Sequence, residues 1–212
     1  SVTLAFTAGG VLKASAIAEN GGFLLAVAFV MILGFGVQAG MFPMHAWLPA
    51  AHPVAPAPAS AVLSAMIVKA GVLAIIRVVT MFGRDFLRNT WMQTAWICLT
   101  LITVFMGSLL AYREPVLKKR LAYSTVSQLS YILFGLAVMN EEALAGSLLH
   151  VLAHGFVKAA LFLCAGAIIY KTGKTRVEEM RGIGREMPLT MWCFTIASLG
   201  LIGIPPTGGF IS

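Results

Sequence analysis

Two lysines and two histidines lie inside apolar segments of this 212-residue chain, where ionisable side chains are costly. His150, His154 and Lys158 follow one another at intervals of four residues. A helix turns by about 100° per residue, so these three side chains share one helix face. Histidine gains and loses a proton between about pH 5 and 8, and bridging water can carry that proton onward. The spacing therefore predicts a proton relay along one helix.

Lys69 lies near the middle of another apolar segment, residues 60–82. At that depth its amine is too far from either membrane surface to reach water comfortably. A buried lysine can serve as a proton donor and acceptor. No acidic residue of the chain is placed to neutralise it, and pairing with a backbone carbonyl for packing is the alternative. We predict that Lys69 exchanges a proton during function.

The chain offers little for other chemistry. His150 and His154 have a spacing found in zinc sites, but Val-Leu-Ala between them lacks the glutamate of the zinc-protease motif. No third ligand is evident, so we predict no metal, and structural hydrogen bonding by either histidine is the alternative. The sequence has no glycine-rich phosphate loop, cysteine cluster or Ser-His-Asp pattern. We therefore predict no bound cofactor and no catalytic residue.

Uncharged polar side chains recur just after the basic residues 118–120. Ser124, Ser127 and Gln128 fall on one helix face, together with Tyr131. Such groups hold water or bridge neighbouring helices in membranes. We predict that they support the relay, with packing as the alternative.

Charged residues make up 11% of the chain and hydrophobic residues 59%, whereas soluble domains are about 25% charged. This composition excludes a soluble enzyme, a disordered chain and a small disulfide-stabilised domain, and it indicates a protein immersed in a lipid bilayer. The net charge of +7 comes from short segments between apolar runs, so we predict no nucleic-acid binding. We expect an all-α polytopic membrane protein of one domain, with about six to seven transmembrane helices. The predicted spans are residues 22–42, 60–82, 90–112, 121–139, 143–170 and 188–212, with part of a further helix at 2–17.

Basic residues gather in two loops on the same side of the predicted bilayer. One loop holds Arg113 and the basic residues 118–120, and the other holds five basic residues within 171–185. The opposite side has Arg84 and Arg88. The positive-inside rule places the basic loops in the cytoplasm, and we expect the inner membrane of a prokaryotic cell.

Two segments interrupt the helical pattern. Pro43 and Pro49 belong to a stretch with five prolines, which cannot form one helix because each proline lacks an N–H and clashes with the preceding turn. Pro205 and Pro206 interrupt the last apolar segment. Paired breaks of this kind mark ion sites in transporters, and irregular backbone at membrane depth must be buried or line a cavity. We predict two broken helices; ordinary surface turns are the alternative.

Four motifs, in this order, resemble the antiporter-like membrane subunits of respiratory complex I, multisubunit Na⁺/H⁺ antiporters, membrane-bound hydrogenases and formate hydrogenlyases. They read GMFPMHAWLPAAHPVAPAPASAVLSAMIVKAGVLAIIR, LKKRLAYSTVSQLSYILFGL, HVLAHGFVKAALFLCAGAI and GIPPTGGFIS. The resemblance implies two inverted five-helix repeats, each with one broken helix, and a mid-membrane chain of lysines, histidines and water. Residues 1–82 would end the first repeat and residues 90–212 would form most of the second. Lys69 would be the central relay lysine, and His150, His154 and Lys158 would lead to the second half-channel.

The chain departs from the family pattern in three ways. Many members have a lysine five residues before the proline of the first break, where this chain has Gln38. A neutral amide passes hydrogen bonds but holds no proton, so we predict that Gln38 belongs with Ser124, Ser127 and Gln128 among the residues that relay or support the relay. The family's acidic partner lies upstream of Ser1, and the chain stops at Ser212, near the position of a further family lysine. We expect the chain to be a fragment.

We predict a proton-translocating membrane subunit that performs no redox chemistry itself. Its partners would be other membrane subunits of an NADH-quinone oxidoreductase-like or hydrogenase-type redox complex. One alternative is a subunit of a multisubunit Na⁺/H⁺ antiporter, which would handle Na⁺ as well as protons. A second alternative is a degenerate, structural subunit of the membrane arm, which Gln38 favours.

Overall fold

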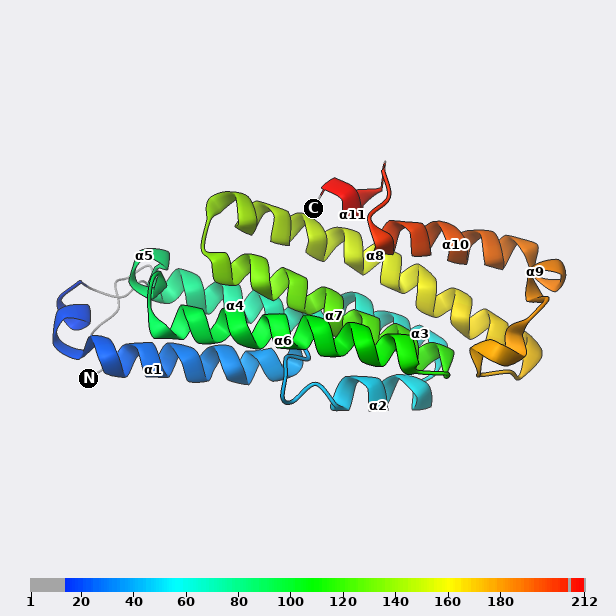
Figure 1. The fold of residues 1–212 in the computed structure, drawn as a ribbon, viewed down its shortest axis with the longest axis horizontal. Coiled ribbons are helices and arrows are strands. Elements are labelled where there is room, and N and C mark those ends of the chain that lie inside the picture. The colour runs from blue at the N-terminus through cyan, green and yellow to red at the C-terminus, as the bar shows by residue number, and fades with distance from the viewer. Residues whose placement is uncertain (1–13, 206, 212) are drawn as a thin grey trace.

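The computed structural model describes residues 14–205 and 207–211, which form helices with no β-strand among them. Five helical segments are long and apolar enough to cross a membrane (Figure 1). They are α1 (Ala14–Gln38), the continuous run of α3 (Ala57–Val62), η2 (Leu63–Ile67) and α4 (Val68–Phe82), α6 (Trp91–Arg113), α7 (Leu117–Val138) and α8 (Glu141–Thr172). The shorter elements are α2 (Trp47–Val54), α5 (Arg84–Leu87), the 3-10 helix η3 (Val177–Met180), α9 (Ile183–Glu186), α10 (Pro188–Ile202) and α11 (Gly208–Ile211). The predicted all-α polytopic membrane fold is confirmed.

Several predicted spans have different bounds in the structure. The sixth is shorter than expected, because α10 has 15 residues and ends before Gly203, whose φ of 82° favours glycine. The partial helix predicted at 2–17 overlaps the described structure only at residues 14–17. These residues belong to α1, which runs without interruption from Ala14. Residues 1–13 of that prediction lie outside the described residues.

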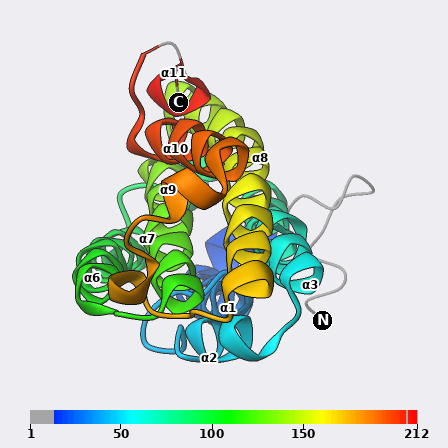
Figure 2. The same cartoon turned by 90° about the vertical axis from the view of Figure 1, so that its right-hand side faces the viewer.

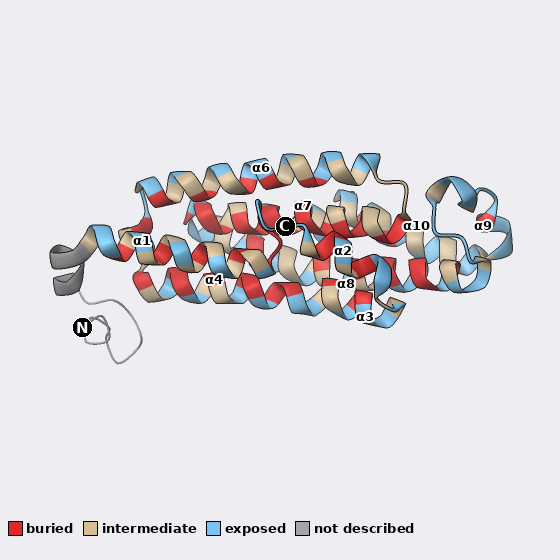
Figure 3. Ribbon diagram, turned by 90° about the horizontal axis from the view of Figure 1, so that it is seen from below, coloured by how far each residue is buried: buried red, intermediate tan, exposed pale blue. Residues whose placement is uncertain are grey.

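Helix α7 occupies the centre of the bundle. Its apolar stretch is 61% buried, against 22–39% for the other four spans (Figure 3). It packs against α6 on one side and α8 on the other, with α2 beside its first half (Figure 2). Small residues allow these close approaches: a Cβ on Gly107 of α6 would lie 3.0 Å from the backbone nitrogen of Ser127 in α7. Side chains on α7 can therefore reach groups on most of its neighbours.

The two basic segments meet at one end of the bundle, on the right in Figure 1. Leu117 N donates a hydrogen bond to Thr175 O over 3.0 Å, and Val177 N donates to Pro115 O over 3.0 Å. The prediction that these segments share one side is confirmed. The predicted start of the fourth span at residue 121 is wrong, because α7 already begins at Leu117 and takes in the basic residues 118–120.

The first predicted break lies between α1 and α3. Helix α1 ends at Gln38, and the backbone groups freed there bond to neighbours: Phe42 N donates to Thr103 Oγ1 over 3.0 Å, and Trp47 Nε1 donates to Val37 O over 2.8 Å. The stretch is less irregular than expected, since α2 is helical. Pro49 lies in the first turn of α2, where its missing N–H removes no hydrogen bond.

The second break follows α10. Pro205 lies in it, exposed, and α11 begins three residues later at Gly208. The predicted interruption of the last apolar segment is confirmed. Pro206 lies outside the described residues.

Candidate proton-relay site

Lys69 lies in the first turn of α4 with 5% of its surface exposed. Its Nζ donates a hydrogen bond to the carbonyl oxygen of Ser64. Ser64 belongs to η2, a short π-helical segment, and such segments leave backbone carbonyls free for other partners. The local backbone of η2 therefore holds the amine without a carboxylate. The carbonyl pairing that the sequence left as an alternative is present, and proton exchange by Lys69 stays a prediction.

The three predicted relay residues of α8 project toward α7. Lys158 is fully buried, and its Nζ donates to Leu121 O over 3.1 Å and to Ser124 Oγ over 2.5 Å. His154, 2% exposed, stacks toward His150 with ring centroids 6.1 Å apart. Neither ring nitrogen of His154 has a hydrogen-bond partner among the described residues. One face of α8 thus presents a row of proton-binding groups.

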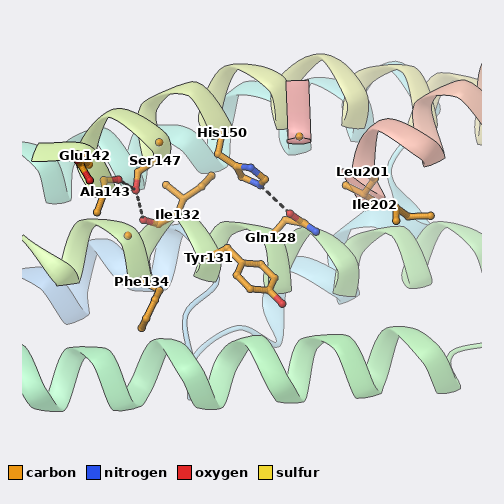
Figure 4. Close-up of a pocket in the computed structure, with 13 residues that line it drawn as sticks. Gln128, Tyr131, Ile132, Phe134, Glu142, Ala143, Ser147, His150, Leu201 and Ile202 are labelled. Atoms are coloured by element: carbon orange, nitrogen blue, oxygen red, sulfur yellow. Dashed lines mark hydrogen bonds between the residues drawn. The ribbon is translucent and has the colours of Figure 1, made fainter. Parts of the chain in front are cut away.

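Of the four supporting residues predicted, two contact the relay directly. Gln128 Oε1 lies 2.8 Å from His150 Nε2 (Figure 4), and Ser124 accepts from Lys158 as above. Ser127 lies on the α6 side instead, where its Oγ is 2.8 Å from Ser108 Oγ. The reason is geometric: α7 has α6 on one side and α8 on the other, and Ser127 points toward α6.

Gln38 lies close to the segment that holds Lys69. Its Nε2 donates to Ile67 O, the last residue of η2, over 3.4 Å. The amide therefore supports the backbone segment that holds Lys69. Its predicted role in the relay itself stays a prediction.

A hydroxyl pair links the two lysine sites. Ser64 Oγ and Thr125 Oγ1 are 2.9 Å apart, and both side chains are fully buried. Thr125 Oγ1 donates to Leu121 O over 2.9 Å, so Ser64 must be the donor within the pair. The same Leu121 carbonyl accepts from Lys158. Lys69 and Lys158 are thus joined through one connected set of hydrogen bonds between η2, α7 and α8.

An open cavity of about 470 Å³ lies beside His150, between α7 and α8 and under the α10–α11 break. Figure 4 shows the His150 ring directed across it toward Gln128, with Leu201 and Ile202 at one side. Glu142, at the start of α8, lines the other end. This cavity can admit water to the outer histidine of the row.

Sequence reasoning missed three buried polar residues around these sites: His52, Ser64 and Thr125. His52 in α2 stacks flat on Phe162 of α8, with ring centroids 4.4 Å apart. Its position in the proline-rich stretch was the one available signal, since a polar residue in an apolar broken segment is unusual. For Ser64 and Thr125 no signal was available, because a lone hydroxyl in an apolar helix is common.

No carboxylate pairs with Lys69 or Lys158 among the described residues, whose two ion pairs are Arg84 with Glu141 and Lys119 with Glu114. The described part of the chain also shows no group of three side chains able to ligate a metal. Broken helices, buried lysines and a histidine row together define a polytopic membrane protein with ionisable side chains in its interior.

The family is identified by comparison. The model of the NADH:quinone oxidoreductase/Mrp antiporter transmembrane family matches residues 3–212, and the chain belongs to this family. It is 40% identical over 191 residues to NADH-quinone oxidoreductase subunit N of Desulforudis audaxviator, a match that covers 89% of this chain and 38% of that protein. It is 35% identical over 195 residues to one subunit of the Na⁺/H⁺ antiporter of Alkalihalophilus pseudofirmus, covering 92% of this chain and 39% of that protein.

A solved structure shares the fold. The match to the Mrp complex from Dietzia sp. DQ12-45-1b has a TM-score of 0.84 and 31% identity, over 92% of this chain and 36% of that one. The antiporter-like architecture and the family resemblance are therefore confirmed. The chain spans less than two fifths of the length of each of these relatives.

Proposed function

We propose that the protein is a proton-translocating membrane subunit of an NADH-quinone oxidoreductase-like or hydrogenase-type redox complex. In this role Lys69 passes protons to the His150, His154 and Lys158 row, and partner subunits carry out the electron transfer. The observation that supports this most is the connected set of buried hydrogen bonds between Lys69 and Lys158, with no carboxylate in it. Amines held only by neutral acceptors can give up a proton without leaving a buried negative charge behind.

The electrostatic effect of the Lys69 charge on the α8 row supports coupled rather than independent proton movements. Its charge acts on His150, His154 and Lys158 alike. In an interior of low dielectric, adding a proton to one of these groups disfavours a second proton on the others. A proton arriving at Lys69 would therefore drive one off the α8 row.

Lys69→Ala in the complete protein, within its assembled complex, tests this function. Proton uptake by inside-out membrane vesicles, followed with a permeant amine dye after addition of the electron donor, should fall at least tenfold. Lys69→Arg should lose uptake as well, because arginine keeps the charge but does not release its proton. Lys174→Ala, an exposed lysine in the second basic segment, is the matched control and should keep uptake. Normal uptake by the Lys69 variants would favour the alternative of a purely structural role.

A component of a Na⁺/H⁺ antiporter is the second candidate, supported by the Mrp structural match and by the antiporter relative from Alkalihalophilus pseudofirmus. The same vesicles separate the two. In an antiporter, Na⁺ added without an electron donor changes the vesicle pH, and Lys69→Ala abolishes that change. In a redox complex, only the donor produces uptake.

Orientation and repeat organisation belong to the same proposal. The basic segments at one end of the bundle are cytoplasmic under the positive-inside rule, in a prokaryotic inner membrane. Residues 1–82 end a first repeat and residues 90–212 form most of a second, inverted one. Each repeat then contributes one broken helix to the ion path.

A further inference from the structure

A second cavity, of about 320 Å³, lies at the end of the bundle opposite the basic segments, near α5 in Figure 1. We call it the Arg84 cavity. It lies between α4, α7 and the start of α8, and its apolar lining residues are Ile76, Val79, Leu136, Met139 and Leu144. The lining extends from Gly83 back to Ile76, about 10 Å along α4. Ligand pockets in proteins begin at about 300 Å³, so this cavity can hold part of an elongated apolar molecule.

The polar side chains that line the Arg84 cavity offer mainly hydrogen-bond donors. Arg84 has five N–H donors, of which one bonds to Glu141 Oε1 over 3.2 Å. Asn140 Oδ1 accepts from Glu141 N over 2.7 Å, which leaves the two N–H donors of the Asn140 amide for another partner. Thr80 donates its hydroxyl hydrogen to Ile76 O over 2.8 Å. Since no carboxylate lines the cavity among the described residues, these donors match an anion rich in acceptor oxygens.

Arg77 adds a further positive charge beside the Arg84 cavity. It lies three residues before Thr80 on α4, so the two side chains are neighbours on one helix face. Arg77 is exposed five residues before the end of α4, and neither ion pair of the described residues includes it. Arginine keeps its proton, and a guanidinium within a membrane span is costly unless an anion meets it. The anions that a bilayer surface supplies are lipid headgroups.

We propose that the Arg84 cavity binds an anionic phospholipid from the leaflet at this end of the bundle. The lipid phosphate bonds to Arg77, Arg84 and the Asn140 amide, and one acyl chain lies against the apolar lining. Guanidinium groups bind phosphate oxygens through paired, charge-assisted hydrogen bonds. The lack of a lining carboxylate favours a headgroup without an ammonium, such as that of phosphatidylglycerol. This site is separate from the relay and does not rest on the proposed function.

The bound lipid joins α4 to the turn between α7 and α8. Arg84 begins α5, directly after α4 and Gly83, and Asn140 directly precedes α8. A phosphate bonded to both reinforces the link that the Arg84–Glu141 pair already makes between these segments. The lipid is therefore a structural ligand of the end opposite the basic segments.

Photocrosslinking locates this lipid in the complete protein within its assembled complex. Phosphatidylglycerol that carries a diazirine on one acyl chain is added to the detergent-solubilised complex and illuminated, and mass spectrometry identifies the modified residues. Adducts are expected on the apolar lining, at Leu136 and Leu144. Excess unlabelled phosphatidylglycerol should suppress them, whereas phosphatidylcholine with the same acyl chains and inorganic phosphate should not.

Arginine variants test which groups hold the headgroup. Arg77→Gln and Arg84→Gln should each reduce the adducts about tenfold, because each removes charge-assisted hydrogen bonds to the phosphate. Glu141→Gln is the matched control for Arg84→Gln, since it breaks the same ion pair but leaves the guanidinium for the lipid; the adducts should stay or increase. Arg88→Gln changes an exposed arginine at the same end that does not line the cavity, and it should leave the adducts unchanged.

The remaining outcomes overturn the proposal. Equal suppression by phosphatidylcholine means that no anionic headgroup is selected, and suppression by inorganic phosphate means an anion site without a lipid. A loss in Glu141→Gln or Arg88→Gln as large as in Arg77→Gln assigns the effect to the fold or to surface charge in general. Absence of adducts on the lining means that another part of the protein or a neighbouring subunit covers the cavity. None of these outcomes depends on the proton uptake of Lys69→Ala, so the proposed function is tested separately.

Discussion

The hydrogen bond between the Ser64 and Thr125 hydroxyls joins η2, which holds Lys69, to α7, which bonds to Lys158. Ser64 uses its carbonyl for Lys69 and its hydroxyl for Thr125. Ser64→Ala and Thr125→Val should each destabilise the protein by about 0.5–1.5 kcal/mol, the usual loss for one hydrogen bond. The double variant should be little worse than the worse single one, because both remove the same bond. Thermal unfolding in detergent, followed by circular dichroism, gives the three values, and strictly additive losses would contradict this pairing.

Which residues could be recognised in advance depended on the range of their interactions. The α8 row was predictable because its members share one helix and a fixed spacing. His52, Ser64 and Thr125 were not, because their burial depends on partners far along the chain: Phe162 for His52, and each other for the two hydroxyls. A sequence pattern reports neighbours within a helix and carries no information about such contacts.

At the scale of elements, α1 and α4 pack so closely at Gly71 that no side chain fits between them. A Cβ there would lie 2.8 Å from Phe35 O and 2.9 Å from Ala39 N, both backbone atoms that cannot move aside. Gly71→Ala should therefore destabilise the protein by about 1–3 kcal/mol and disturb Lys69, two residues away. Gly34→Ala is the matched control, since a Cβ at Gly34 meets nothing within 4 Å. Thermal unfolding of the two variants measures the difference, and equal midpoints would show that the helices can separate without loss.

The long helices and their breaks followed from composition, because apolar runs must satisfy their own backbone in lipid and proline prevents this. The local geometry of the broken region did not. Helix α2 forms despite two prolines, because Ser60 and Lys118 bond to the carbonyls of His52 and Ala55 near its end. The π-helical turn of η2, which presents Ser64 O to Lys69, likewise depends on tertiary contacts.

At the scale of the whole molecule, the charged residues divide the bundle into two unlike ends. One end joins the two basic segments through the backbone bonds of residues 115–117 to residues 175–177. The other end has the Arg84–Glu141 pair at 3.2 Å, and Glu142 there lines the cavity beside His150. A net proton path across the bundle requires the two ends to face opposite sides of the membrane.

Labelling of introduced cysteines tests this arrangement. With Cys98 and Cys193, which are exposed, replaced by alanine, Lys174→Cys should react with a membrane-impermeant maleimide in inside-out vesicles and not in intact cells. Arg88→Cys, exposed at the opposite end, should react in intact cells only. We expect this labelling pattern because nine basic residues lie at one end of the bundle and two at the other. The positive-inside rule retains the more basic end in the cytoplasm. The reverse pattern would place the basic segments outside the cytoplasm, and reaction of both cysteines from one side would rule out a bundle that crosses the membrane as described.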